Sequence, residues 1–267
     1  MTAILTPRGQ EPAAGQAEGG TPPRVSATGL LKRHVAMPIF LALALAALLG
    51  YVASRSLDVV ERRSLNAGYL LTRVVEHVEL TVAVAAVVVV IAVPAGIVLT
   101  RPRLKRVATP LVGVANIGQA VPSIGVLVLL ALTIGIGARI AVAAFALYTI
   151  LPVLRNTTVG LQQVDPSLLE AARGMGMSRT AVLVRVELPL AVPVILAGIR
   201  TALVISVGTV ALATFVNAGG LGDVINNGIT TDRPLVTLTG SALTAILALL
   251  VDWIAGIGED VLRPRGL

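Results

Sequence analysis

Polar side chains that could bind a solute fall at helical spacing inside otherwise apolar stretches. Asn116, Gln119 and Ser123 are three and four residues apart, which places them on one face of a helix. Ser206 and Thr209 form a shorter stripe of the same kind. Amides and hydroxyls within a membrane span are costly unless they face a wet cavity or another helix. The stripes therefore indicate a lined translocation path or hydrogen bonding between packed helices, and we favour the path for the first stripe.

The residue types of the chain exclude several other kinds of functional site. The chain has no cysteine and only two histidines, His34 and His77, so it offers no thiol nucleophile and no histidine metal cluster. Its lysines, Lys32 and Lys105, are both followed by arginine. A phosphate-binding P-loop needs a lysine followed by Ser or Thr. We therefore expect this chain to bind no metal, no ATP and no other cofactor.

The composition places these residues in a membrane protein. Of the 267 residues, 55% are hydrophobic and 13% are charged, whereas a soluble domain has about 25% charged residues. The net charge of +7 is divided between long apolar runs, which is typical of membrane topology and not of nucleic-acid binding. These features exclude a soluble globular enzyme and a disordered or fibrous chain.

The apolar runs predict the architecture. Crossing ~30 Å of hydrocarbon takes about 20 helical residues, and lipid leaves no other partner for backbone polar groups. We expect an all-α, polytopic integral membrane helix bundle of about six transmembrane helices. The expected spans cover residues 35–53, 78–100, 111–134, 138–155, 189–216 and 235–257.

The segments outside the spans set the orientation. Residues 1–34 are rich in Pro, Gly, Ala, Glu and Thr and predict a disordered tail. The run that follows, 35–53, resembles a signal peptide, but its length and the later spans favour an uncleaved first span of a transmembrane domain over 35–258. Fourteen Arg and Lys residues fall on one side and six on the other, with one inside a span. The rule of positive inner loops then places both termini, including the short tail 259–267, and the loop 156–188 in the cytoplasm.

That cytoplasmic loop predicts a helix–turn–helix elbow on the membrane surface. Asp165-Pro166 combines an N-cap acceptor with proline at the first helical position. Gly174 and Gly176 permit a left-handed stop, and Ser178 can cap a second short helix. We expect Pro189 to open the next span. An amphipathic connector without a partner is the alternative interpretation.

Seven residues of this elbow resemble the EAA loop of ABC importer permeases. The match consists of Glu170, Ala171, Ala172, Gly176, Val186, Leu188 and Pro189, with Val186 in the place where isoleucine is usual. The resemblance implies a type I importer fold in which this loop docks in a cleft of a separate ABC ATPase subunit. ATP and magnesium would be held by that partner.

Longer segments resemble the glycine betaine/carnitine/choline permease subfamily, over about residues 75–260. They include the stretches 147–157, 172–177, 186–189, 193–201 and 218–223. This resemblance implies an inner-membrane transport subunit, not an enzyme, that carries osmoprotectants. It also implies two further partners: an extracytoplasmic substrate-binding protein and a second permease subunit, the same or a related chain.

Aromatic residues are scarce for a protein expected to handle quaternary ammonium groups. Such cations are usually held in aromatic cages, but the chain has only three Phe, three Tyr and one Trp, which are scattered. Affinity is therefore expected to lie in the external binding protein, and Tyr148, near Pro152, is the aromatic residue that we expect on the path.

We interpret Arg200, inside a span, as an anchor and Asp252 as an interfacial cap. Residues 219–222 indicate a tight external turn or re-entrant segment, or merely a flexible loop.

Two rival functions remain open from the sequence. An importer of the same architecture for another solute, such as an amino acid, would share the EAA loop. An ion-coupled secondary transporter would need intramembrane carboxylates, and the spans offer only Glu79 and Asp252, both near span ends. The sequence does not favour an intramembrane enzyme, because it offers no convergent Ser/His pair, no paired Asp residues and no metal-binding set.

Overall fold

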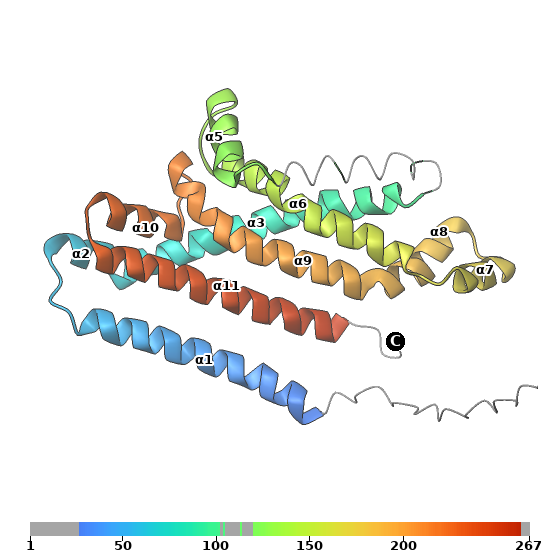
Figure 1. The fold of residues 1–267 in the computed structure, drawn as a ribbon, viewed down its shortest axis with the longest axis horizontal. Helices are drawn as coiled ribbons and strands as arrows, with labels where there is room; N and C mark the ends of the chain where they lie inside the picture. Colours follow the sequence, from blue (N-terminus) through green and yellow to red (C-terminus); the bar gives the residue numbers. More distant parts are fainter. Residues whose placement is uncertain (1–26, 102–103, 105–112, 114–119, 263–267) are drawn as a thin grey trace, which may run out of the picture.

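The computed structural model describes residues 27–262 except 102–103, 105–112 and 114–119, with side chains from residue 35 onward. Within these ranges the fold is all-helical, and five helical stretches are long and apolar enough to cross a membrane. The long helices are α1 (Ala27–Ala53), α3 (Ala67–Leu99), α6 (Ala138–Gln162), α9 (Leu188–Val210) and α11 (Pro234–Leu262). They lie side by side along one direction (Figure 1).

Short elements close the two ends of this bundle (Figure 1). At one end, which we call the elbow end, lie α7 (Pro166–Gly174), α8 (Arg179–Val182) and the π-helical turn Leu183–Glu187. At the other, the hairpin end, lie α2 (Val59–Ser64) and α10 (Leu221–Thr230), with the 3-10 turn Ala211–Val216 leading towards α10. The helix α5 (Ser123–Thr133) packs on α6 but runs in a different direction from the long helices. The beginning of α1 and the end of α11 both lie towards the elbow end.

The first helix begins earlier than the sequence predicted. Residues 27–34 belong to α1, so the disordered tail expected over 1–34 is wrong for its last eight residues, while residues 1–26 lie outside the described range. Ala, Leu, Lys and Arg in this stretch are strong helix formers, and they extend the apolar helix beyond its hydrophobic run.

The third expected span, 111–134, is not one continuous helix. Val121 and Pro122 are non-helical, and α5 begins only at Ser123. Proline disfavours helical geometry at the residue before it, which explains the break at Val121. The 11 residues of α5 rise only about 16 Å, which is less than a membrane crossing. Most of residues 105–119 lie outside the described range, so the third of the six expected spans stays a prediction.

The remaining expected spans are present but longer than their apolar cores. The N-cap Asn66, whose side chain accepts hydrogen bonds from the backbone of Gly68 and Tyr69, starts α3 eleven residues before residue 78. At the elbow end α6 continues to Gln162 and α11 continues to Leu262. Hydropathy marks the part of a helix that lies in lipid, whereas caps and propensity decide where the helix itself stops.

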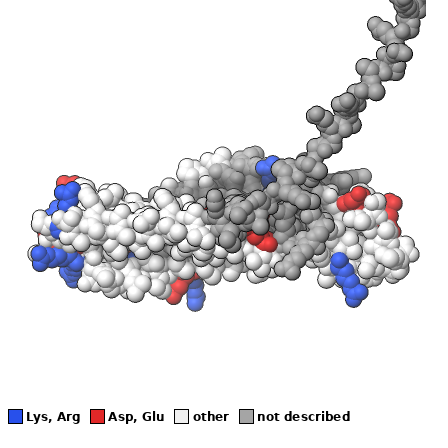
Figure 2. Space-filling view, turned by 90° about the horizontal axis from the view of Figure 1, so that it is seen from below, with Lys and Arg blue, Asp and Glu red and all other residues white. Residues whose placement is uncertain are grey.

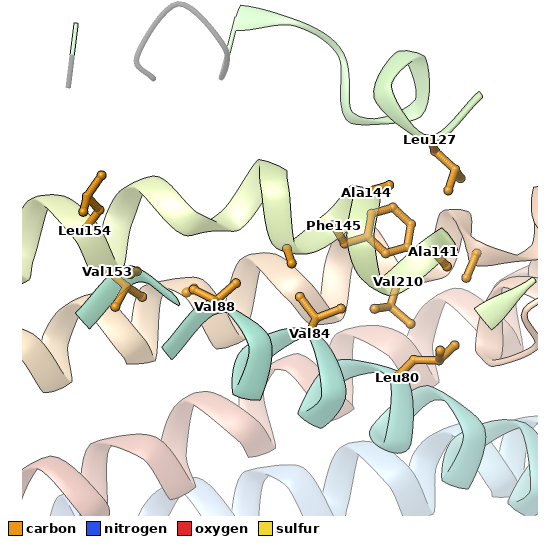
Figure 3. Packing of buried hydrophobic residues seen from close by; sticks show 14 of the residues in the cluster. Leu80, Val84, Val88, Leu127, Ala141, Ala144, Phe145, Val153, Leu154 and Val210 are labelled. Carbon is orange, nitrogen blue, oxygen red and sulfur yellow. The ribbon is translucent and has the colours of Figure 1, made fainter. Parts of the chain in front are cut away.

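The core lies where α3, α6 and α9 cross. Figure 3 shows Val84 and Val88 of α3 facing Phe145 and Val153 of α6, with Val210 at the end of α9 beside them. All five side chains are at most 1% exposed. In lipid, close packing of this kind and not hydrophobic burial holds helices together.

Glycines allow the closest approach between these helices. A Cβ atom placed on Gly198 of α9 would lie 2.7 Å from Cβ of Asn156 and 2.9 Å from the carbonyl oxygen of Pro152, both in α6. A Cβ atom on Gly96 of α3 would lie 2.7 Å from Thr157. Small residues at these crossings therefore determine the spacing of the three helices nearest the elbow.

Charged residues are concentrated towards the ends of the molecule. In the view of Figure 2 Lys, Arg, Asp and Glu side chains gather at the two ends, and a few more charged side chains lie on the surface between them. The long helices themselves are strongly apolar, as the hydrocarbon layer of a bilayer requires.

Candidate functional site: the elbow and the polar groups of the bundle

The elbow starts with a capped helix, as the sequence predicted. The Asp165 carboxylate accepts a hydrogen bond of 2.8 Å from the backbone N–H of Ser167, and Pro166 occupies the first helical position of α7. The same N–H holds the pKa of Asp165 below its ordinary value, because it stabilises the charged form of the carboxylate. The cap thus fixes where α7 leaves the membrane helix α6.

A left-handed residue turns the chain between α7 and α8. Gly176 has a φ of +81°, and its N–H donates to the carbonyl of Arg173 at 2.9 Å. Gly174, the other expected stop, is instead the last residue of α7. Ser178 then caps α8 by accepting a hydrogen bond of 3.3 Å from the N–H of Ala181. The predicted helix–turn–helix is therefore confirmed, with Gly176 alone making the left-handed turn.

The predicted coupling residues divide into an outer and an inner set by their exposure. The outer set consists of the exposed residues Glu170, Ala171 and Gly176. The inner set begins with Ala172, which is 2% exposed, and includes the three residues at and just before the start of α9. Val186, Leu188 and Pro189 are half-buried.

Two large apolar residues extend the outer set. Leu168 and Met175 are 48% and 75% exposed at the two ends of α7. Exposed apolar groups beside small residues form a surface suited to contact with another protein.

The next long helix begins where the sequence predicted, with Pro189 in the first turn of α9. No loop precedes it, because a continuous helical stretch runs from Arg179 to Val216. Proline lacks an N–H and is tolerated here because the helix widens into a π turn just before it. The elbow is therefore joined to α9 without a loop.

The residues expected to line a translocation path are only partly described. Asn116 and Gln119 lie outside the described residues, so their stripe with Ser123 stays a prediction. Ser123, at the start of α5, and Tyr148 of α6 are half-buried. The break at Pro122 separates Ser123 from any helix that precedes it.

The hydroxyls of the second stripe bond within their own helix. Ser206 is fully buried, and its hydroxyl donates to the carbonyl of Ala202 at 2.7 Å. The half-buried Thr209 donates to the carbonyl of Ile205 at 3.1 Å. This arrangement satisfies both hydroxyls without a solute, so in this structure the two residues contribute to helix packing; their role in a path stays a prediction.

The hairpin end contains an ionic network that the sequence analysis did not identify. Arg73 of α3 contacts Glu76 at 2.7 Å and Asp223 of α10 at 2.8 Å. The Glu76 carboxylate also accepts a hydrogen bond of 2.9 Å from the N–H of Gly220. Gly219 and Gly220 are both left-handed, with φ of +84° and +91°. The glycine-rich stretch is therefore a tight turn, held onto α3.

His77 connects three elements at the same end. It is fully buried, its Nε2 lies 2.9 Å from the carbonyl of Val207, and its Nδ1 accepts a hydrogen bond of 3.2 Å from the N–H of Leu221. These two partners select the neutral ring with the proton on Nε2. His77 thus has a packing role between α3, α9 and α10.

Arg200 and Asp252, which the sequence analysis treated separately, form a pair. The guanidinium of Arg200 contacts the two carboxylate oxygens of Asp252 at 2.6 and 2.8 Å, and Glu259 lies 3.5 Å away. Residues near the start of α1, including Met37 and Phe40, complete the wall of an adjoining cavity of about 610 Å³. The interpretation of Arg200 as an anchor agrees with this contact, and Asp252 is its partner on α11.

Comparison with known proteins identifies the type of membrane protein. Residues 92–264 match the family described as the inner membrane component of binding-protein-dependent transport systems. The chain belongs to this family. It is therefore a multi-pass inner-membrane permease, the non-catalytic transport component of an ABC importer.

Three relatives match about three quarters of this chain and most of their own length. The choline transport system permease protein OpuBB of Bacillus subtilis is 38% identical over 78% of this chain and 95% of its own length. The carnitine transport permease protein OpuCD of Listeria monocytogenes is 40% identical over 74% of this chain and 89% of its own. The osmoprotectant import permease protein OsmW of Salmonella typhimurium is 39% identical over 76% and 95%, respectively.

Solved structures share the fold. A chain of the MetNI methionine ABC transporter, in an inward-facing conformation, superimposes with a TM-score of 0.64 at 26% identity, over 73% of this chain and 97% of that chain. A chain of an amino acid ABC transporter gives a TM-score of 0.62 over 78% of this chain, and at 18% identity this likeness shows the fold alone. The type I importer architecture expected from the elbow is confirmed.

Proposed function

We propose that this permease imports quaternary ammonium osmoprotectants such as choline, carnitine and glycine betaine. The observation that carries the proposal is an identity of 37–40% over about three quarters of the chain with permeases named for these solutes. The likeness to a methionine transporter is weaker, at 26% identity, so an amino acid is the alternative solute.

The elbow is the proposed contact with the ATPase. Its outer set, Glu170, Ala171 and Gly176, is exposed beside Leu168 and Met175, while Ala172 packs inward. A rigid, capped element with an exposed small-residue and apolar face suits a cleft in a partner protein. ATP-driven closure of two ATPases would then draw two elbows together and open the paired bundles towards the binding protein. Discharge of the solute and hydrolysis would reverse the movement.

Selectivity is proposed to lie mainly in an extracytoplasmic binding protein. Phe145 is 1% exposed in the core, and the rings of Tyr51 and Tyr69 each lie under an arginine, 4.8 and 4.9 Å from Arg55 and Arg73. These three rings are therefore not free to form an aromatic cage for a quaternary ammonium group.

Uptake by the assembled complex tests the solute. The permease, its ATPase and its binding protein are reconstituted in vesicles, and uptake of labelled choline, carnitine and glycine betaine is measured with methionine as a parallel substrate. We expect ATP-dependent uptake of at least one quaternary ammonium compound and none of methionine. A matched complex with an ATPase unable to hydrolyse ATP is the control, and uptake that survives in it would show a secondary transporter.

The orientation of the chain has its own test. Because the chain contains no cysteine, single cysteines can be placed at the exposed Met175 of the elbow and at Val59 of α2, which is 84% exposed. We propose that the elbow and both termini are cytoplasmic. A membrane-impermeant thiol reagent added to whole cells should label position 59 and spare position 175, and the reverse pattern would overturn the proposed topology.

A further inference from the structure

The helix that leaves the elbow contains a hinge. At Leu183–Glu187 the helix widens into a π turn, in which the N–H of Leu188 donates to the carbonyl of Leu183, five residues earlier. Pro189 has no N–H for the carbonyl of Arg185, so a regular α-helical bond is missing at this point. A π turn inside a long helix is a common place for a helix to bend, and it often marks a functional position. Movement of α7 and α8 would therefore bend the chain here.

A buried carboxylate lies at the end of this hinge. Glu187 is 6% exposed, and its two oxygens contact the guanidinium of Arg101 at 2.6 and 3.3 Å. Arg101 follows the last turn of α3, and its Nε also donates to the carbonyl of Ile97 at 3.2 Å. The guanidinium of Arg101 therefore joins the end of α3 to the π turn that precedes α9, although Arg101 and Glu187 are 86 positions apart in the chain.

The strength of this contact follows from its geometry and burial. A two-pronged arginine–carboxylate contact is among the stronger hydrogen-bonded pairs and fixes direction as well as distance. Removing Arg101 leaves the Glu187 carboxylate, whose side chain is 8% exposed, as a desolvated charge without compensation, whereas the side chain of Arg101 is 37% exposed. The positive guanidinium is also favourable at the C-terminus of α3, where the last carbonyl groups lack helical partners.

We propose that the Arg101–Glu187 pair links α3 to α9, so that both helices follow a displacement of the elbow. Glu187 and Arg101 are positioning residues for coupling, because they act on the movement and do not touch the solute. Without the pair, a displacement of α7 and α8 would reach α9 alone, through the π turn. This inference rests on the proposed docking of the elbow on an ATPase.

Three variants test the link in the complete reconstituted complex. Glu187→Gln keeps the size of the side chain and removes its charge, Arg101→Glu reverses a charge, and the double exchange Arg101→Glu with Glu187→Arg restores a pair. Arg185→Gln, an exposed position of the same π turn, is the matched control. We expect the solute transported per ATP hydrolysed to fall roughly tenfold or more in the single variants, as when a charge-assisted hydrogen bond is lost. The double exchange should recover most of it, and the control should match the wild type.

A distance measurement separates coupling from a merely structural role. Spin labels are attached to cysteines introduced at Val98 on α3 and Val184 in the π turn, which are 49% and 55% exposed. In the otherwise wild-type protein their distance distribution should stay unchanged when ATP is added, because the helices move together. In Glu187→Gln it should shift or broaden on ATP addition. A changing distance in the wild-type protein overturns the link even if the variants fail to fold.

A cross-linking experiment distinguishes failure of the proposed contact with the ATPase from failure of the Arg101–Glu187 link. A cysteine at Leu168 on the exposed face of α7 is cross-linked to the ATPase in the same complex. No cross-link would contradict the proposed function of the elbow and with it the link. A cross-link together with wild-type transport per ATP in Glu187→Gln would overturn the link alone.

Discussion

Gly176→Val tests whether the left-handed turn of the elbow is needed for coupling. Gly176 has a φ of +81°, which L-residues with a branched Cβ rarely adopt. A Cβ atom at this position would find nothing within 4 Å, so a larger side chain meets no obstacle. The cost of the substitution is therefore conformational, about 1–2 kcal/mol for a left-handed L-residue.

That cost translates into a change in the population of the correctly shaped elbow. About 1–2 kcal/mol corresponds to a factor of roughly 5–30 in an equilibrium. We expect Gly176→Val to insert in the membrane normally and to reduce the solute transported per ATP hydrolysed by a factor in this range. The assay is uptake and ATP hydrolysis by the reconstituted complex, with the amount of inserted permease measured in parallel.

Two control substitutions isolate the backbone effect. Gly176→Asn should keep most of the coupling, since asparagine tolerates the left-handed conformation. Gly174→Val makes the same change of side chain two residues away, at a helical position where a Cβ atom also meets nothing within 4 Å, and should stay close to the wild type. Wild-type coupling in Gly176→Val, or an equal loss in Gly176→Asn, would refute the reasoning.

Three further substitutions have expected outcomes. Gly198→Ala should lower the thermal midpoint of the purified protein, at a cost of about 1–3 kcal/mol for overpacking against α6, whereas Gly208→Ala, with open space around its Cβ, should not; equal midpoints would contradict the crossing geometry. Because the pKa of Asp165 is lowered in the folded protein, its cap is complete at neutral pH and is lost as the pH falls below about 4 through that lowered pKa. Asp165→Ala should therefore reduce thermal stability at pH 7 more than at pH 3, and an equal reduction at both would count against the cap. Gln119→Leu should lower transport without weakening association with the ATPase, measured by co-purification, and unchanged flux would show that the polar stripe serves packing.

Local sequence signals predicted the elbow well. The cap at Asp165, the left-handed turn at Gly176 and the cap at Ser178 each depend on neighbours within a few residues, so spacing was sufficient. Pro189 likewise lies in the first turn of α9, where its missing N–H is tolerated. The spacing did not predict the π turn that joins α9 to the elbow without a loop.

Hydropathy predicted the helices better than their ends. It located five of the spans, but it missed the break at Pro122 and the early start of α1 at Ala27. An average over about 20 residues does not detect a single proline, and it does not register polar helix formers that continue a helix into water.

The residue types and their order alone made this an integral membrane protein and shaped the elbow, because lipid forces apolar segments to be helical and because caps and turns are interactions between near neighbours. Only the packed bundle decided which polar groups meet. Arg101 with Glu187, Arg200 with Asp252 and Arg73 with Asp223 are 86, 52 and 150 positions apart. No periodicity connects such partners, since their contact depends on how the helices that carry them pack together.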